Sequence, residues 1–459
     1  MVFLHRITRA WKRWRIRRLY NSSEWVKASN LAEEHLFCKT NDLFARDIVI
    51  RCMYNQQNWN GVLEFAKRFP LEQNKILADR ARGKIGGDGE ALPERFSLIE
   101  WDDVNLLENW YQYGDTVWWR HPWGWTHWIM PAGFQLSNIH PSLLALATKV
   151  LIKPWVPEST KIVTERREFG TKLALSFSGG MDSMAAALLL PTDTILSYHE
   201  RSFPSLLSHD LPIRLFDEIK QRWGRDVLQV PSNHEKIRTI HGKQVGFSTD
   251  YAAGVHLILL ADYLNLGGVA FGTPIDNIWL QKGRKFRDFK ESWHWNYWVK
   301  EFANAGLHLV MPINHISEAG AMKICQQSDL IESINSCLRG RAGKFCGKCW
   351  KCFHKNGPLG RKVDPMSNEI QILLHKIPLR TAQHALWAIQ RMGLEYVVPH
   401  LSKELIQPLD WWEKAYAPGL DLIQRPWRTT IQENTEKFIP YMENPELLHK
   451  VNLFSDYPL

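Results

Sequence analysis

Short apolar runs alternate with helical segments between residues 172 and 326, and this alternation constrains the fold more than any other feature of the sequence. The predicted strands are Leu173–Phe177, Thr194–Tyr198, Asp226–Val230, Gly268–Phe271 and His308–Pro312. The predicted helices are Asp182–Leu190, Leu215–Arg222, a long buried helix over Tyr251–Leu266, and Ser317–Gln326. Parallel strands need crossover connections, which helices usually supply. The sequence therefore predicts an α/β fold with a doubly wound parallel sheet.

Patterns outside this region divide the 459-residue chain further. The expected units are a basic amphipathic segment 1–20, helical hairpins 21–70, a linker and Trp-rich region 71–165, the α/β domain 166–335, a four-cysteine segment 336–360 and a helical C-terminal region 361–459. The composition, with 45% hydrophobic and 23% charged residues, excludes a mainly disordered or low-complexity chain.

The first 20 residues hold a large part of the formal net charge of +9, because they contain several Arg and Lys residues and no acid. Trp11 and Trp14 share one helical face with Phe3 and Ile7. Three interpretations remain open for this segment. It docks by its Trp face while the Arg side chains stay solvated, it lies on an anionic membrane surface, or it binds nucleic acid.

Two Trp-containing units follow. Trp25 and Trp59 lie 34 residues apart, and Ala32 and Ala66 each come seven positions later. This period is typical of tetratricopeptide-type helical hairpins, with plain hairpins as the alternative, and it predicts a platform for a protein partner. Residues 71–100 are predicted to be a linker. Residues 101–128 hold seven Trp and are predicted to form an irregular packed cap, with a ligand-binding surface as the alternative.

The sharpest motif follows the first predicted strand. It reads Ser178-Gly179-Gly180-Met181-Asp182-Ser183 and leads directly into a helix. Two glycines allow a tight turn, and the N–H groups at a helix N-terminus attract anions. Asp182 is expected either to cap this helix or to meet a magnesium ion on a bound phosphate group. No Lys follows the glycines, which excludes a Walker-type loop.

A cysteine cluster follows the α/β region. Cys337, Cys346, Cys349 and Cys352 have the spacing C-x8-C-x2-C-x2-C, which suits a structural zinc site. An iron–sulfur cluster is the alternative, and His354 is a candidate replacement for one thiolate. The remaining cysteines, Cys38, Cys52 and Cys325, are interpreted as core residues of helices.

The loop and the cysteine cluster together resemble the PP-loop ATP pyrophosphatases, and among these the 7-cyano-7-deazaguanine synthase family of the queuosine pathway. The resemblance covers about residues 173–353 and includes Met311-Pro312-Ile313, and Ser336-Cys337 before the later cysteines. It implies a Rossmann-like domain that binds ATP, magnesium and zinc. The implied catalytic residues are Asp182 and Ser183. The implied nucleotide-binding residues are Ser176, Ser178, Gly179, Gly180, Met181, Asp182, Ser183, Tyr198, Arg201, Gly272 and Asp276.

The resemblance also implies a reaction. Enzymes of this family adenylate a carboxylate with ATP, release pyrophosphate, and let ammonia displace AMP to give an amide and then a nitrile. This chain departs from the family in its substrate segment, where Phe271–Asn277 replaces a Gly-Tyr-Pro-Asp-Cys-Arg sequence. The helix after Pro312 also carries Ser317-Glu318 where the family has a Lys. The sequence therefore favours ATP-dependent activation of a small-molecule acid over the deazaguanine substrate itself.

Two other functions remain open. One is an amidotransferase or sulfur transferase of the same superfamily that acts on a sugar or a tRNA base. The other is a non-catalytic scaffold that binds nucleotide or nucleic acid through a zinc knuckle. No membrane span or secretory signal is recognisable, and few cysteines occur, so reduced thiols in the cytoplasm are expected. A homodimer is a further expectation, and ammonia would be free or come from a partner.

Overall fold

The structure is a computed structural model of the 459-residue chain. It describes residues 2–22, 24–38, 42–69, 74, 77–78, 81, 107–121, 124–154, 164–202, 209–240, 246–337, 339–340 and 344–459. The predicted linker over residues 71–100 lies almost entirely outside the described residues, as do Trp101 and Trp123 of the Trp-rich region.

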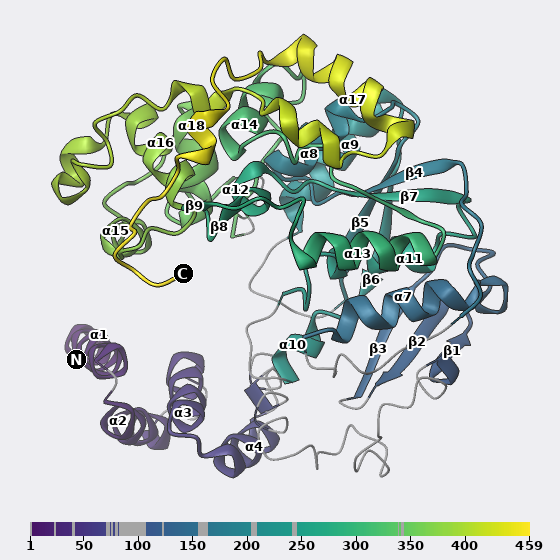
Figure 1. The fold of residues 1–459 in the computed structure, drawn as a ribbon. Coiled ribbons are helices and arrows are strands. Elements are labelled where there is room, and N and C mark those ends of the chain that lie inside the picture. Colours follow the sequence, from purple (N-terminus) through teal and green to yellow (C-terminus); the bar gives the residue numbers. More distant parts are fainter. Residues whose placement is uncertain are drawn as a thin grey trace.

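Within the described residues, eight strands form one sheet in the order β1-β2-β3-β6-β5-β4-β7-β10 (Figure 1). Their bounds are β1 Trp110–Tyr113, β2 Thr116–His121, β3 Gly124–Ile129, β4 Lys172–Ser176, β5 Ile195–Arg201, β6 Val227–Ser232, β7 Leu266–Phe271 and β10 His308–Val310. Strands β6, β5, β4, β7 and β10 run parallel. The predicted α/β fold with a large, mostly parallel sheet is therefore confirmed. A separate hairpin pairs β8 Leu280–Gln281 with β9 Lys285–Phe286.

Helices cover both faces of the sheet, and α8, α14 and α17 pack together while α7, α11 and α13 form a second group (Figure 1). The helices of this body are α7 Pro141–Ile152, α8 Met181–Leu189, α9 Asp210–Trp223, α10 Lys236–Ile240, α11 Val255–Leu259, α12 Ile275–Ile278, α13 Trp293–Asn304, α14 Glu318–Gln326, α15 Asn368–His375, α16 Ala382–Met392, α17 Arg425–Phe438 and α18 Glu446–His449. Every residue of β7 is buried, as expected for a strand that is covered on both faces.

The strand order creates a switch point. β4 is the first parallel strand in the chain and lies in the middle, with β5 and β6 on one side and β7 and β10 on the other. Connections that leave β4 and β7 therefore diverge, and a crevice opens at the carboxyl ends of these two strands. The segments Phe177–Gly180 after β4 and Gly272–Pro274 after β7 emerge at this edge.

The Trp-rich region extends the sheet, so the prediction of an irregular cap is wrong. Strands β1, β2 and β3 are antiparallel, and β3 pairs with β6 through Trp128 and Ser232. Burial alternates along β2, so Trp119 is buried while its neighbour Trp118 faces the other side. The rings of Trp119 and Trp128 stack on Trp110 at 5.4 and 5.5 Å between ring centroids. These three Trp residues fill a core, whereas Tyr111 and Tyr113 on β1 are exposed.

The predicted long helix over Tyr251–Leu266 is also wrong. The chain forms a 3₁₀ turn at Ala252–Gly254 and the short helix α11, and it reaches β7 through turns. Gly254 packs its backbone against Phe271, where a Cβ atom would lie 2.7 Å from the ring. Asn265 adopts the left-handed conformation, with φ +53°, which ends any helical run.

The N-terminal helices form cores of their own. They are α1 Val2–Asn21, α2 Trp25–Cys38, α3 Leu43–Asn55 and α4 Trp59–Arg68. Trp25 and Trp59 each begin a helix and pack edge-on against Tyr20 and Tyr54, both at 5.1 Å between ring centroids. These two pairs lie 34 residues apart, so the period seen in the sequence corresponds to a repeated packing unit. The tetratricopeptide comparison stays a prediction.

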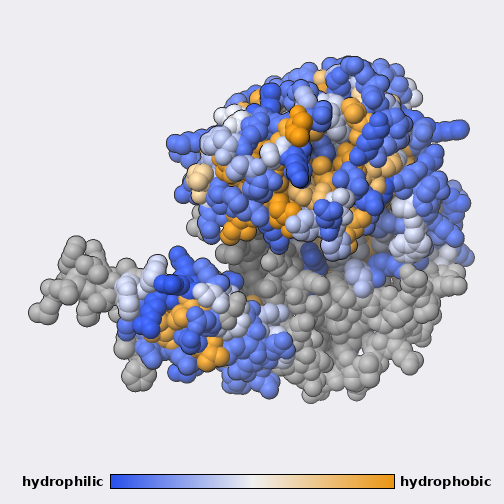
Figure 2. All heavy atoms as spheres, turned by 60° about the vertical axis from the view of Figure 1, so that its left-hand side comes forward, coloured by the Kyte–Doolittle hydropathy of each residue, from blue (hydrophilic) through white to orange (hydrophobic). Residues whose placement is uncertain are grey.

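The face of α1 that carries Trp11 and Trp14 is open, which corrects the interpretation that the helix docks through its Trp residues. Their side chains are 54% and 55% exposed, whereas Ile16 is fully buried. Arg15 and Arg18 lie over the two indole rings. Figure 2 shows apolar side chains at the surface of this helical lobe and of the main body. Among the described residues, no helix has both the length and the hydropathy that a membrane span requires.

Arg167 ties the segment before β4 to its neighbours, and it yields a testable prediction. Its Nε lies 2.6 Å from Asp262 Oδ1, and its other nitrogens donate to the carbonyl oxygens of Ala261, Leu266 and Gly306. The variant Arg167→Met should lower the free energy of unfolding by about 2–3 kcal/mol, because three carbonyl oxygens each lose a hydrogen bond and Asp262 loses its charged partner. Chemical denaturation measures this change. The neighbouring exposed Arg166→Met is the control and should change stability little, and equal effects of the two variants would contradict the assignment.

Candidate functional site

The loop between β4 and α8 is a tight turn held by its own hydroxyl groups. Gly179 has φ +72°, a conformation that favours glycine, and Gly180 is the N-cap residue of α8. The hydroxyl of Ser183 lies 3.0 Å from that of Ser178 and donates to the carbonyl oxygen of Gly180, also at 3.0 Å. Because Gly180 is the cap, the alternative in which Asp182 caps the helix is excluded.

The first turn of α8 lies at the crevice, and its backbone N–H groups have no hydrogen-bond partners within the helix. Gly180, the N-cap residue, has no side chain that could accept a hydrogen bond from them, and a residue distant in sequence accepts one instead. Ser336 Oγ accepts a hydrogen bond from the backbone N–H of Met181 at 3.0 Å. The positive dipole of a helix N-terminus attracts negative charge, and the Asp182 carboxylate lies in this first turn. The role of Ser336 in this turn was not predicted from the sequence.

Gly272 brings the end of β7 against the same turn. A Cβ atom at this position would lie 2.9 Å from the carbonyl oxygen of Asp182 and 3.0 Å from the N and Cα of Ser183. Any side chain would displace the helix start. The structure therefore places this predicted nucleotide-binding residue in direct contact with the loop, where it keeps the crevice narrow.

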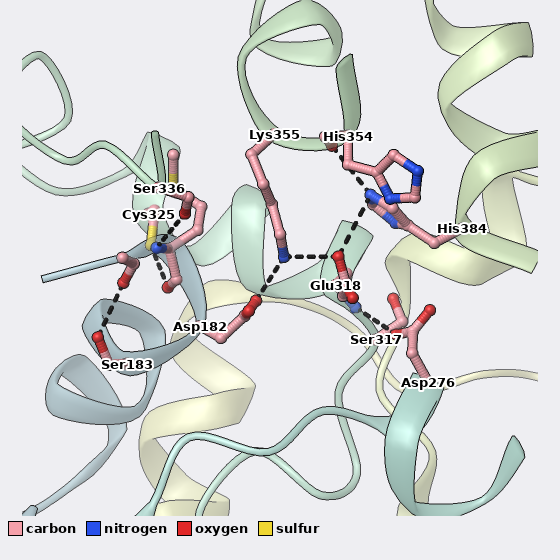
Figure 3. A network of polar contacts seen from close by, with 12 residues as sticks. Asp182, Ser183, Asp276, Ser317, Glu318, Cys325, Ser336, His354, Lys355 and His384 are labelled. Atoms are coloured by element: carbon pink, nitrogen blue, oxygen red, sulfur yellow. Dashed lines mark hydrogen bonds and ion pairs between the residues drawn. The ribbon is translucent and has the colours of Figure 1, made fainter. Parts of the chain in front are cut away.

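A buried lysine closes the loop from the opposite side (Figure 3). Lys355 Nζ lies 2.6 Å from Asp182 Oδ1 and 2.8 Å from Glu318 Oε2, and its side chain is only 6% exposed. Asp182 lies in the first turn of α8, Glu318 begins α14, and Lys355 follows the last cysteine of the cluster. One ammonium group thus joins three parts of the chain. Lys355 was not predicted from the sequence, and its place three positions after the last cysteine was the available signal.

Burial and charge act in opposite directions on this network. Burial raises the pKa of Asp182, although Lys355 opposes the rise. Burial would raise the pKa of Glu318 as well, but Lys355 and then His384 lower it to about 2. For Lys355, burial alone would lower the pKa, and the two carboxylates reverse the effect and raise it. The ammonium and the Glu318 carboxylate are therefore both charged at neutral pH.

Asp276 lies behind Glu318 rather than beside Asp182. Its Oδ2 accepts a hydrogen bond from the Glu318 N–H at 2.7 Å, so it orients the first turn of α14. The carboxyl is fully buried, and burial, followed by the charge of Glu318, raises its pKa well above the usual range. Asp276 is thus connected to the loop through Glu318 and Lys355.

The other predicted nucleotide residues have polar groups engaged elsewhere. Arg201, at the end of β5, pairs with Glu235 through Nε at 2.8 Å and through a second nitrogen at 3.0 Å. The Tyr198 hydroxyl hydrogen-bonds His209, and burial raises its pKa. Ser176 Oγ donates to the carbonyl oxygen of Ala253 at 3.1 Å. Among these residues, none contacts Asp182 or Lys355 through these bonds.

The four cysteines predicted as metal ligands come together. The sulfurs of Cys337 and Cys349 lie 4.0 Å apart, those of Cys346 and Cys352 lie 3.7 Å apart, and all four fall within 4.8 Å of one another. Ligands at about 2.3 Å in a tetrahedron are about 3.8 Å apart, so the set fits a single metal ion such as zinc. An iron–sulfur cluster would need more room between the sulfurs. His354 is outside this set and faces Glu318 and His384.

The cysteine segment also positions residues on the loop. Ser336, which contacts the start of α8, directly precedes Cys337. Lys355 lies in a single π-helical turn, Cys352–Asn356, that begins at a cysteine. Asn356 donates to the Cys352 sulfur at 3.5 Å from the same turn. Short stretches of main chain thus connect the cysteine cluster to Ser336 and Lys355, the two residues that contact the first turn of α8.

A comparison with protein families finds one match. The family of unknown function DUF6395 matches residues 297–452. This stretch contains Glu318, the four cysteines, Lys355 and His384, whereas the loop after β4 lies outside it. A comparison with curated proteins gives no match for this chain.

The link between the cysteines and Lys355 gives a second prediction. Replacing one ligand, Cys349→Ser, should lower the metal content measured by elemental analysis by the one ion held by the four cysteines. It should also change the near-ultraviolet circular dichroism, because Trp350 adjoins the site. Cys52→Ser is the control, since Cys52 is a buried thiol of α3, and it should retain the full metal content. Unchanged metal content in Cys349→Ser would contradict the assignment of the four cysteines as ligands.

Proposed function

We propose that this chain is an ATP-dependent, adenylate-forming C–N ligase, similar to the 7-cyano-7-deazaguanine synthases of the PP-loop superfamily. It would adenylate the carboxylate of a small-molecule acid, release pyrophosphate and let ammonia displace AMP. The observation that carries this proposal is the contact of Lys355 with Asp182 at the N-terminus of α8, in the crevice between β4 and β7. An anion site of this kind suits the pyrophosphate leaving group.

The charges around the loop support a magnesium-bound nucleotide. Asp182 and Glu318 share the single ammonium group of Lys355, so the network carries excess negative charge when both carboxylates are ionised. Asp182 is the residue that would hold a magnesium ion, and the ion would offset phosphate charge in the transition state. Lys355 would then turn from Asp182 to a phosphate oxygen. At the start of α14 the synthase family has a Lys where this chain has Ser317-Glu318. Here Lys355, from the turn after the last cysteine, would supply the ammonium group instead.

We assign a structural role to the cysteine site and propose zinc as its metal. Four thiolates complete the tetrahedral coordination of a zinc ion and leave no position for a reacting water. Zinc there would hold Ser336 and Lys355 against the first turn of α8. The acid would bind in a cavity of about 590 Å³ beside the cysteine segment. Its lining mixes the cations Arg214, Lys344, Lys348, Arg361 and Lys362 with the acids Glu218, Glu332 and Asp364, so the cations are in excess.

Nitrogen transfer is favoured over sulfur transfer by the state of Cys325. This thiol lies at the loop and donates to the carbonyl oxygen of Met181 at 3.3 Å. It is fully buried, and burial raises its pKa, so the nucleophilic thiolate is scarce at neutral pH. The thiol thus supports the packing of α14 against α8 and is unsuited to carry sulfur.

The reaction can be tested through its products. With ATP, magnesium, ammonium and a set of carboxylic acids, the protein should release AMP and pyrophosphate, measured by ³¹P NMR. Asp182→Asn should lower this rate by about 100-fold, the scale on which loss of one transition-state charge contact acts. Asp217→Asn, on the exposed side of α9, is the matched control and should keep the wild-type rate. Release of ADP, or equal rates in both variants, would rule out the proposed chemistry.

The role of Lys355 can be tested by nucleotide affinity. Lys355→Met should weaken ATP binding by about 10- to 100-fold in calorimetry, because a charge-assisted hydrogen bond to phosphate is lost. Lys355→Arg retains the charge and should recover most of the affinity. Lys323→Met is the control, because Lys323 is a lysine of α14 whose ammonium group pairs with Glu413 at 2.9 Å instead of with Asp182. Unaltered affinity in folded Lys355→Met protein would show that this lysine does not reach the nucleotide.

A further inference from the structure

Three side chains of types that commonly bind metal ions lie beside Lys355, and they are separate from the four cysteines. Glu318 begins α14, His354 lies in the turn Cys352–Asn356, and His384 lies in α16. One ligand atom of each lies within 4.8 Å of the others (Figure 3). The two imidazole rings are 5.2 Å apart between centroids, and both histidines are fully buried. The carboxylate and the two imidazoles therefore face one shared point inside the protein.

Three of the four ring nitrogens of these histidines have no hydrogen-bond partner among the described residues. Neither ring nitrogen of His354 has a hydrogen-bond partner among the described residues, and the same holds for Nδ1 of His384. His384 Nε2 lies 2.9 Å from the His354 carbonyl oxygen and 3.7 Å from Glu318 Oε2. Buried polar groups are nearly always satisfied, so two neighbouring imidazoles in this state call for a further ligand. A metal ion satisfies an imidazole lone pair in a buried, dry site.

Glu318 is the charged carboxylate of this cluster, because Lys355 lowers its pKa, whereas burial raises the pKa of Asp182 and Asp276. Two neutral imidazoles add no charge, so Glu318 would be the one anionic ligand of a bound ion. Lys355 would remain paired with Asp182, and the ion would be bound by the Glu318 carboxylate.

We propose that Glu318, His354 and His384 form a second metal site that takes one divalent transition-metal ion, with zinc as the best match. Two imidazoles and one carboxylate are a donor set that zinc accepts, and three protein ligands leave the fourth position for water. Neighbouring ligands of a tetrahedral ion with bonds of about 2.1 Å lie about 3.4 Å apart. The 3.7 Å between His384 Nε2 and Glu318 Oε2 is close to this value, and Nε2 would give up its hydrogen bond to the His354 carbonyl oxygen in order to bind the ion.

Such a site would fix the partner of Lys355. The ion would bind the start of α14, the cysteine segment and α16 together, and α16 belongs to the C-terminal helical region. It would thereby set the position of the Glu318 carboxylate, on which the ammonium of Lys355 rests. The inference goes beyond the proposed ligase activity and does not depend on it, since metal binding is measured without nucleotide.

Metal stoichiometry tests the proposal. The full chain is saturated with Zn²⁺, dialysed against metal-free buffer and subjected to elemental analysis. Wild-type protein should retain two zinc ions per chain, Cys349→Ser one, and His384→Gln or His354→Gln one. His315→Gln is the matched control, because His315 is also fully buried but bonds Thr435 at 2.9 Å, and it should retain two. Retention of a single ion by wild-type protein, or of two by the His384 and His354 variants, would overturn the second site.

Titration of the metal-free wild-type chain with Co²⁺ decides the question even if a variant fails to fold. The cysteine site should give intense thiolate-to-cobalt charge transfer that saturates with one ion. A second ion should then add only weak visible bands from nitrogen and oxygen ligands, with no further charge transfer. No spectral change beyond one ion per chain would refute the proposal.

Discussion

The ammonium group of Lys355 is the contact on which the arrangement of the site depends. An ammonium buried to this extent is costly unless it is paired, and Asp182 and Glu318 both lie within 2.8 Å of it. Asp182 lies in the first turn of α8, Glu318 begins α14, and Lys355 follows the cysteine cluster. Because both carboxylates share this partner, the three elements hold one another in place. Removal of Lys355 leaves two buried carboxyl groups without their cation, so the crevice and the cysteine segment form a single structural unit.

Features that are local in sequence could be predicted, and features that need distant partners could not. The strand, the glycines and the following helix lie in one short run, and so do the last three cysteines. Ser336 meets Met181 across 155 positions, and Lys355 meets Asp182 across 173. No pattern along the chain reports such contacts. The same limit applies to Asp276, which sits at the expected strand end but bonds the Glu318 N–H.

The two errors in the fold have physical causes of the same kind. In the Trp-rich region the density of large aromatic residues concealed an alternation with period two, so Trp118 and Trp119 were given a common environment although they face opposite sides of β2. In the segment before β7, the apolar run from Tyr251 was long enough for a helix. Tertiary contacts intervene there, since Arg167 takes the carbonyl oxygen of Ala261. Competition from such contacts overrides local propensity.

The region matched by the family of unknown function clarifies how the chain is built. Residues 297–452 supply Ser336 and Lys355, which contact the first turn of α8 from outside the loop, and Glu318, which pairs with Lys355. The loop itself belongs to the preceding strands. Neither part has a complete site alone: the helix start would lack its cation and its hydroxyl, and the lysine would lack Asp182. A relative that shares only the matched region therefore needs an equivalent carboxylate and helix N-terminus from its own sheet to reproduce this chemistry.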